Sequence, residues 1–160
     1  MSPVQITWHP TLPGAYVLTT EQWFPVPRET AFSFFGDAAN LEAITPPWLH
    51  FEVVTPRPIE MHPGQLIDYK LRLHQFPVRW RTEISAWEPS TRFIDRQLKG
   101  PYHLWVHEHT FEDHEGGTLV RDRVEYKVPG GRLIHALLVR RDLERIFMFR
   151  RQVLEQHFRS

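Results

Sequence analysis

Apolar and polar side chains alternate along residues 100–129, and this alternation predicts a long β-hairpin. Gly116 and Gly117 lie between its two arms and are expected to supply the positive φ angles that tight hairpin turns require. The residues predicted to point inward are Trp105, His107, His109 and Phe111 on the first arm, and Val120, Asp122, Val124 and Tyr126 on the second. This inward face is mostly apolar, yet it holds two imidazoles, a carboxylate and a phenol.

Five more segments combine β-branched or aromatic residues with boundaries of proline, glycine or polar residues, which is typical of strands. They are residues 15–25, 49–55, 65–75, 78–88 and 92–100. The inward residues predicted in the last three are Ile67, Tyr69, Leu71 and Leu73, then Val78, Trp80, Thr82 and Ile84, then Phe93, Asp95 and Gln97. Because turns too short for crossovers join the six strands after residue 48, we expect them to form an antiparallel meander, in a sheet of about seven strands in all.

Two short helices are predicted after the first strand. Pro27 can open the first helix, and Gly36 ends it. Asp37 can cap the second helix, which stops before Pro46 because a residue that precedes a proline is pushed out of the α region.

The pattern of residues 133–158 predicts one long helix, with a length of about 40 Å at a rise of 1.5 Å per residue. Apolar residues recur there at spacings of three and four, which indicates one buried stripe. The stripe consists of Ala136, Val139, Leu143, Ile146, Phe147, Val153, Leu154 and Phe158. Ile134, Leu138 and Phe149 lie off the stripe and mark either a second contact surface or ordinary exposed apolar positions.

This order of elements favours an α+β fold of one domain, residues 1–160, in which a curved sheet wraps the long C-terminal helix and buries both apolar faces. Residues 1–14 hold three prolines and are expected to form an extended arm.

The 160 residues carry no net charge, so nothing suggests a nucleic-acid or anionic-membrane partner. The absence of cysteine excludes disulfides, thiolate zinc sites and cysteine nucleophiles. No apolar stretch approaches membrane-spanning length, and the N-terminus lacks the pattern of a signal peptide. We therefore expect a soluble, cytoplasmic protein.

The sequence from about residue 16 to residue 158 also resembles a known family, and a set of particular residues carries this resemblance. They are Pro46 to Leu49, Phe51, Trp80, Thr82, Trp87 to Pro89, Phe93, Asp95, Gln97, Gly100 to Tyr102, Trp105, His107, His109, Phe111, Gly117, Thr118, Asp122, Val124, Tyr126, Pro129 and Phe147 to Arg150. The chain resembles the helix-grip fold of the START and pollen-allergen-like superfamily, SRPBCC, and within it the bacterial polyketide cyclase/dehydrase-like and ligand-binding members. The resemblance implies a cavity between sheet and helix that holds a hydrophobic small molecule. It carries over no catalytic residue.

The first functional hypothesis is a non-catalytic binder of a hydrophobic or aromatic molecule, without a cofactor, and a homodimer is considered as its oligomeric state. The apolar wall would come from Tyr69, Trp80, Phe93, Trp105 and Phe147. Polar atoms of the ligand would be oriented by Asp95, Gln97, His107, His109, Asp122, Tyr126 and Arg150.

Two other interpretations of these polar residues stay open. A polyketide cyclase/dehydratase-like enzyme could use His107, His109 and Asp122 for proton transfer near neutral pH. Alternatively, the imidazoles and acids only satisfy one another in the core.

The pair His107 and His109 also has the spacing of half a cupin metal site, with both imidazoles on one strand face. However, the neighbouring Gly100 and Glu112 are each displaced by one position, and no suitably spaced downstream histidine follows. The sequence pattern thus predicts no metal.

Arg150 interrupts the apolar stripe of the long helix. It could lie at the edge of the stripe with its head in water. It could instead turn inward, since arginine is the cation best suited to buried ion pairs. We predict the inward orientation, with Asp95 or Asp122 as the partner, because a carboxylate that faces an apolar cavity needs compensation.

Overall fold

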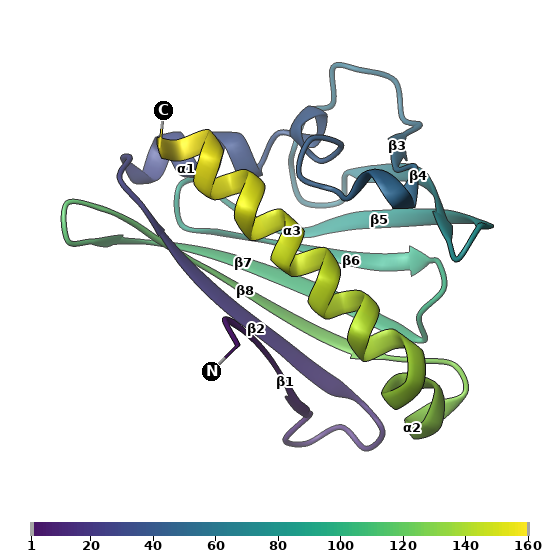
Figure 1. Cartoon of the computed structure of the whole chain (residues 1–160). Helices are drawn as coiled ribbons and strands as arrows, with labels where there is room; N and C mark the ends of the chain where they lie inside the picture. The colour runs from purple at the N-terminus through teal and green to yellow at the C-terminus, as the bar shows by residue number, and fades with distance from the viewer. Residues whose placement is uncertain (1, 160) are drawn as a thin grey trace.

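An antiparallel sheet of eight strands curls around the long C-terminal helix in the computed structural model, which describes residues 2–159 (Figure 1). The strands are β1 Val4–Trp8, β2 Tyr16–Phe24, β3 Glu52–Val53, β4 Leu66–Leu73, β5 Phe76–Glu88, β6 Arg92–Lys99, β7 Leu104–His114 and β8 Gly117–Lys127. Their order in the sheet is β1-β2-β8-β7-β6-β5-β4-β3. The expected α+β helix-grip fold is confirmed, with one more strand than predicted. The two ends of the predicted domain, residues 1 and 160, lie outside the described residues.

The additional strand comes from the predicted N-terminal arm. Residues 4–8 are not a free arm, since β1 pairs along β2 from Val4 opposite Thr20 to Trp8 opposite Tyr16. Val4 and Ile6 are buried, so this short segment alternates as a strand should. The surrounding prolines hid that alternation in the sequence.

The predicted strand 49–55 is much shorter in the structure. Only Glu52–Val53 pairs with β4. The preceding residues Pro47–Leu49 form a 3-10 turn, which Pro46 and Pro47 favour because proline suits the first positions of a helical turn.

The segment after β2 holds one helix, α1 Arg28–Phe35, and short turns in place of the second predicted helix. Asp37 does act as a cap, because its Oδ1 accepts a hydrogen bond from Ala39 N at 2.9 Å. The turn that it caps is a 3-10 turn of only three residues, Ala38–Asn40.

The long helix is present, but a π-turn interrupts its first part. It consists of α2 Gly131–Ile134, the π-turn His135–Val139 and α3 Arg140–Arg159. A π-turn holds more residues than an α-turn and therefore rotates the neighbouring side chains around the axis. Consequently the predicted stripe residue Ala136 is exposed, and His135 is buried in its place.

The predicted stripe is correct along α3, where Leu143, Phe147, Leu154 and Phe158 are buried. Phe158 packs with Phe24 and the phenylalanines of α1, whereas Leu143 and Phe147 pack with β2 and β8. These two apolar clusters hold α3 against the sheet at both ends, and the middle of the helix faces polar residues.

An exposed apolar row lies outside the core on α2 and the π-turn. Leu133, Ile134, Leu137 and Leu138 are all exposed. Ile134 and Leu138, which the sequence placed off the stripe, therefore point away from the sheet. None of the helices within residues 2–159 has the length and apolar composition needed to cross a membrane.

Candidate functional site

A cavity of about 180 Å³ lies between the inner face of the sheet, α3 and the segment that links α1 to β4. Its walls are mostly apolar. The larger lining residues are Phe35, Leu49, Phe51, Met61, Ile67, Tyr69, Leu71, Trp80, Phe93, Tyr102, Trp105, Ile146 and Phe147, and the polar ones include Thr45, Thr82, Asp95, His107, His109 and Arg150.

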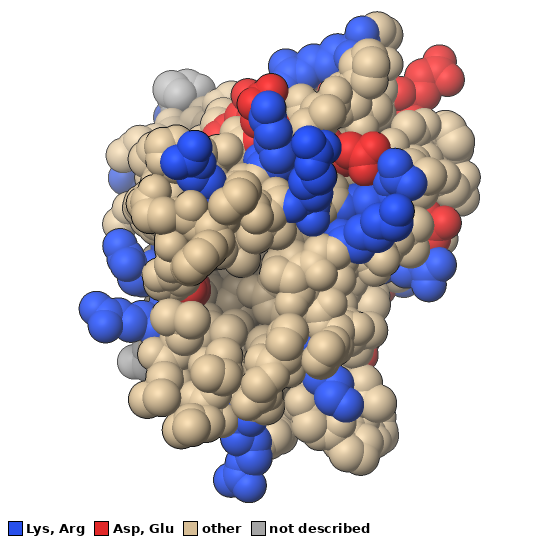
Figure 2. Space-filling view, turned by 90° about the vertical axis from the view of Figure 1, so that its right-hand side faces the viewer, with Lys and Arg blue, Asp and Glu red and all other residues tan. Residues whose placement is uncertain are grey.

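The end of β4 and the first turns of α3 both contribute to the wall of the cavity. Leu73 and Leu143 line the cavity from these two segments, and Figure 2, viewed from their side, shows a hollow in the surface. His74 Nε2 lies 2.7 Å from Asp142 Oδ2 and thus joins the β4–β5 turn to α3. Lys and Arg side chains gather above the hollow in this view, and most of its margin is uncharged.

One wall is aromatic. The Trp80 and Trp105 rings meet edge to face, with centroids 5.4 Å apart and an interplanar angle of 89°. Tyr102 packs against Trp105 at 4.7 Å. The Trp80 Nε1–H is buried and has no hydrogen-bond partner within residues 2–159.

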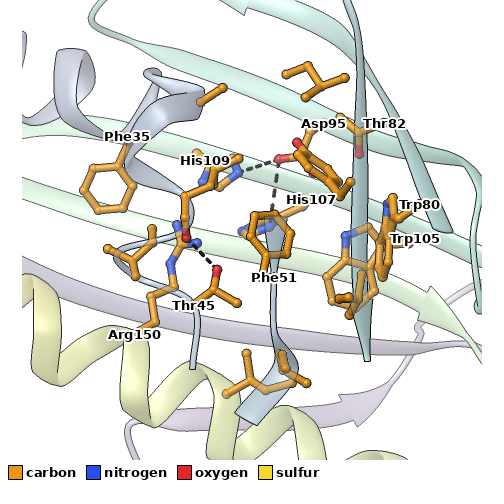
Figure 3. Close-up of a pocket in the computed structure, with 18 of the residues that line it drawn as sticks. Phe35, Thr45, Phe51, Trp80, Thr82, Asp95, Trp105, His107, His109 and Arg150 are labelled. Atoms are coloured by element: carbon orange, nitrogen blue, oxygen red, sulfur yellow. Dashed lines mark hydrogen bonds and ion pairs between the residues drawn. The ribbon is translucent and has the colours of Figure 1, made fainter. Parts of the chain in front are cut away.

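Next to the aromatic wall, on the same face of the sheet, lies a polar cluster, shown in Figure 3; the Trp105 and His107 ring centroids are 6.4 Å apart. His109 Nε2 lies 2.8 Å from Asp95 Oδ2, and His107 Nε2 lies 2.7 Å from Asp122 Oδ1. His109 Nδ1 is 3.0 Å from Asp122 Oδ1, a short contact that is not aligned as a hydrogen bond. The two imidazole rings stack with centroids 3.7 Å apart.

Strand pairing brings the members of this cluster together. Asp95 on β6 is directly opposite His107 on β7, and His109 is directly opposite Asp122 on β8. Side chains opposite one another on a sheet face lie about 5 Å apart at Cβ, which suits a carboxylate and an imidazole. The alternation predicted from the sequence thus places all four on the concave face.

Arg150 reaches this cluster from α3, as predicted. Its Nη2 lies 3.8 Å from Asp122 Oδ1, and its guanidinium lies over the Phe35 ring at 5.5 Å from the centroid. The side chain is 13% exposed, which excludes an orientation into bulk water. Arg150 therefore compensates the Asp122 charge through space rather than through a direct hydrogen bond.

Both carboxyl groups are held in the ionised form. Burial alone would raise the pKa of the Asp122 carboxyl, but Arg150 and the two histidines hold that pKa well below its usual range. Burial also opposes ionisation of Asp95, but the hydrogen bond from His109 and the nearby charges of His107, His109 and Arg150 together outweigh burial and lower the Asp95 pKa.

The two histidines are shifted in opposite directions. Burial, reinforced by neighbouring His109, lowers the pKa of His107. Burial also opposes a charge on His109, but the contacts with Asp122 and Asp95 outweigh it and raise the His109 pKa. A neutral His107 carries one N–H, which points from Nε2 to Asp122, so its Nδ1 lone pair remains available.

Three of the twelve predicted site residues do not line the cavity, and two of these three, Gln97 and Tyr126, are engaged elsewhere. Gln97 is engaged with a turn, where its Nε2 donates to Tyr102 O at 2.7 Å. Tyr126 is fully buried, and its hydroxyl contacts His135 Nε2 at 2.7 Å. The alternation correctly predicted that both residues lie on the concave face of the sheet. Not every side chain on that face reaches the cavity, because some pack beneath it or beside it.

Asp122 has an intermediate position. It lies behind His107 and His109 and does not line the main cavity. The other nine predicted residues, Tyr69, Trp80, Phe93, Asp95, Trp105, His107, His109, Phe147 and Arg150, do line it.

Sequence reasoning missed the wall that the α1–β4 segment supplies. Thr45, Leu49, Phe51 and Met61 line the cavity from irregular backbone, where no periodicity indicates direction. Leu49 and Phe51 belong to the residues that carry the family resemblance, and this resemblance was the one signal in the sequence that could have placed them at the cavity.

Asp95, His107 and His109 could hold a metal ion. Each of the three side chains has one potential ligand atom, and these atoms all lie within 4.8 Å of one another. Within residues 2–159, this is the group of three histidine or acidic side chains that is close enough to share a metal ion.

Comparison with known proteins gives a family and a fold. A family model described as polyketide cyclase / dehydrase and lipid transport matches residues 24–148. No curated protein matches the chain. Among solved structures, protein Ms6760 from Mycobacterium smegmatis is 18% identical, with 96% of each chain covered and a TM-score of 0.68. Ginseng major latex-like protein 151 from Panax ginseng is 12% identical, with 90% of this chain and 97% of that chain covered and a TM-score of 0.66. At these identities the likeness shows the fold alone.

Proposed function

Because the chain belongs to the polyketide cyclase / dehydrase and lipid transport family, we propose that it binds a hydrophobic or aromatic small molecule between the sheet and α3. The observation that carries this proposal is the cavity itself, an apolar enclosure with a few polar groups on one part of its wall. Ligand sites of soluble proteins have this composition. The cytoplasmic location and the homodimer expected from the sequence stay predictions.

The size of the cavity limits the ligand. Its volume of about 180 Å³ slightly exceeds the roughly 150 Å³ of an engineered apolar cavity that takes up benzene. An aromatic molecule of one or two rings therefore fits without rearrangement. A long-chain lipid would require the α1–β4 segment to move away from the sheet.

The polar groups limit the chemistry of the ligand. The Asp95 carboxylate and His107 Nδ1 are the acceptors that the cavity wall offers to a hydrogen-bond donor of the ligand. A neutral ligand with a hydroxyl group satisfies the acceptors. A carboxylate ligand would meet the Asp95 charge and be disfavoured.

Calorimetric titration with 2-naphthol, its methyl ether and 2-naphthoate tests this proposal. We expect 1:1 binding of 2-naphthol, weaker binding of the ether, which lacks the donor, and weakest binding of the anion. Asp95→Asn should reduce the preference for 2-naphthol over 2-naphthoate. Absence of saturable binding for all three compounds by a folded protein would remove the proposal.

An acid–base enzyme is the second candidate function, favoured by the contact of 2.7 Å between His107 and Asp122. A carboxylate behind an imidazole orients it and stabilises its protonated form, which suits a general base. His107→Gln would then abolish turnover of a ketone substrate and leave its affinity nearly unchanged. If the site only binds, that substitution changes affinity, and no compound of a polyketide or aromatic panel turns over.

A further inference from the structure

We propose that Asp95, His107 and His109 form a binding site for one divalent transition-metal ion on the cavity wall. The sequence argued against a metal because no third ligand follows His109 at cupin spacing. The structure supplies the third group from the neighbouring strand β6 instead. This site stands independently of the small-molecule proposal, and its test uses the metal alone.

The potential ligand atoms of the three side chains converge. Asp95 Oδ2 lies 2.8 Å from His109 Nε2 and 4.0 Å from His107 Nδ1. The three ligand atoms all lie within 4.8 Å of one another. Bonds of about 2.1 Å from nitrogen and oxygen to zinc would span such a group after side-chain rotation.

Asp122 occupies the position of a supporting carboxylate. It contacts the other ring nitrogen of each imidazole, at 2.7 Å from His107 Nε2 and 3.0 Å from His109 Nδ1. Metal-bound histidines commonly direct their second nitrogen to such a carboxylate, which fixes the tautomer and strengthens the ligand. Arg150 compensates the Asp122 charge, so Asp95 remains the carboxylate available to the ion.

Burial and access also fit an ion. His107 and His109 are buried, whereas the Asp95 side chain is 22% exposed and lines the cavity. His107 Nδ1 accepts no hydrogen bond from the described residues, and Asp95 Oδ2 lies 4.0 Å from it. An ion held there would keep coordination positions open to water or to a ligand in the cavity.

Metal binding requires one rearrangement. The two imidazoles stack at 3.7 Å with an interplanar angle of 25°, and an ion bonded to both must lie in both ring planes. At least one ring must therefore rotate out of the stack, toward the space of the cavity. Two imidazole nitrogens and one carboxylate oxygen suit Zn²⁺, Co²⁺ or Fe²⁺ better than Mg²⁺ or Ca²⁺.

Cobalt titration of chelator-treated protein without a polyhistidine tag tests the site. We expect 1:1 binding of Co²⁺ by calorimetry, with visible absorption bands that Zn²⁺ abolishes by competition. Asp95→Asn and His107→Ala should each remove the 1:1 binding. Asp122→Asn should weaken it about 10- to 100-fold, as expected for a residue that positions the ligands.

His114→Ala is the matched control, since His114 is an exposed histidine at the far end of the same strand β7. This variant should bind Co²⁺ like the wild type. Circular dichroism distinguishes a variant that has lost metal binding from one that has unfolded. If His107→Ala unfolds, Asp95→Asn still tests the site, because asparagine has nearly the same shape as aspartate. Wild-type protein without 1:1 binding, or undiminished binding by folded Asp95→Asn, would overturn the proposal.

Discussion

At the scale of single residues, the molecule depends on compensation of buried charge. Asp122 is buried and ionised, and three side chains from two elements compensate it. The sequence allowed this network to be predicted in part, because alternation placed both aspartates and both histidines on one face, and helical spacing placed Arg150 opposite. Which acid Arg150 meets depends on side-chain length and helix rotation, and these follow only from the packed structure.

Arg150→Met should therefore destabilise the fold. Removing one partner of a buried pair leaves the other charge uncompensated, at a cost of about 3–5 kcal/mol. His107 and His109 still contact Asp122, so we expect a loss near the lower limit, about 3 kcal/mol, in urea unfolding. Combining Arg150→Met with Asp122→Asn should recover part of that loss. A loss below about 1 kcal/mol, as for an exposed pair, would contradict the account.

His135 should make stability depend on pH. Burial, together with nearby Arg140, lowers the pKa of His135 below the value of 6.5 expected in the unfolded chain. The unfolded state therefore binds the proton more readily, and stability falls as pH drops below 6.5 toward the folded-state pKa. His135→Gln should lose less stability than the wild type between pH 8 and pH 5.5, measured by urea unfolding at each pH.

The control for this comparison is His114→Gln, which changes an exposed histidine. Its pH dependence should match that of the wild type. His107 and His109 titrate in all three proteins, so their contributions cancel in the differences. Equal pH dependence of wild type and His135→Gln would contradict the assignment.

At the scale of elements, regular alternation was the reliable signal. It predicted β4, β5, β6, β7 and β8 to within a few residues, because each carries buried apolar residues on the concave face of the sheet. It failed where tertiary contacts decide the structure. The arm that contains β1 pairs with β2, residues 49–55 are mostly turn, and the π-turn rotates His135 inward in place of Ala136.

The β7–β8 turn gives a prediction at this scale. Only Gly116 of the glycine pair has a positive φ, +76°, and the other positive φ of the turn belongs to Glu115. Gly117 is needed for a different reason, since a Cβ there would meet the Phe24 carbonyl oxygen and the Trp23 ring.

Gly117→Ala should thus cost more than Gly116→Ala. A Cβ at Gly116 meets nothing within 4 Å, so that substitution should cost about 1–2 kcal/mol from backbone strain alone. Gly117→Ala must displace β2 from β8 and should cost about 2–3 kcal/mol, in the upper range of single substitutions. Thermal unfolding of both variants measures the order, and the reverse order would contradict this assignment.

At the scale of the whole molecule, two apolar clusters hold the ends of α3 against the curved sheet, and the middle of the helix faces the cavity. This arrangement follows from the order of elements and could be predicted. The boundary of the cavity could not, because the α1–β4 segment that closes it has no periodic pattern.

The most direct test of the account is ligand binding by a variant in which the cavity is filled. Ile146 lies on α3, is half-buried and lines the cavity, so Ile146→Trp should occupy the space of a ligand ring. Leu137→Trp is the matched control, because Leu137 is 69% exposed on the preceding π-turn. Calorimetry should show 1:1 binding of 2-naphthol to the wild type and to Leu137→Trp, and no binding to folded Ile146→Trp. Equal affinity of all three proteins would show that the ligand does not enter the cavity between the sheet and α3.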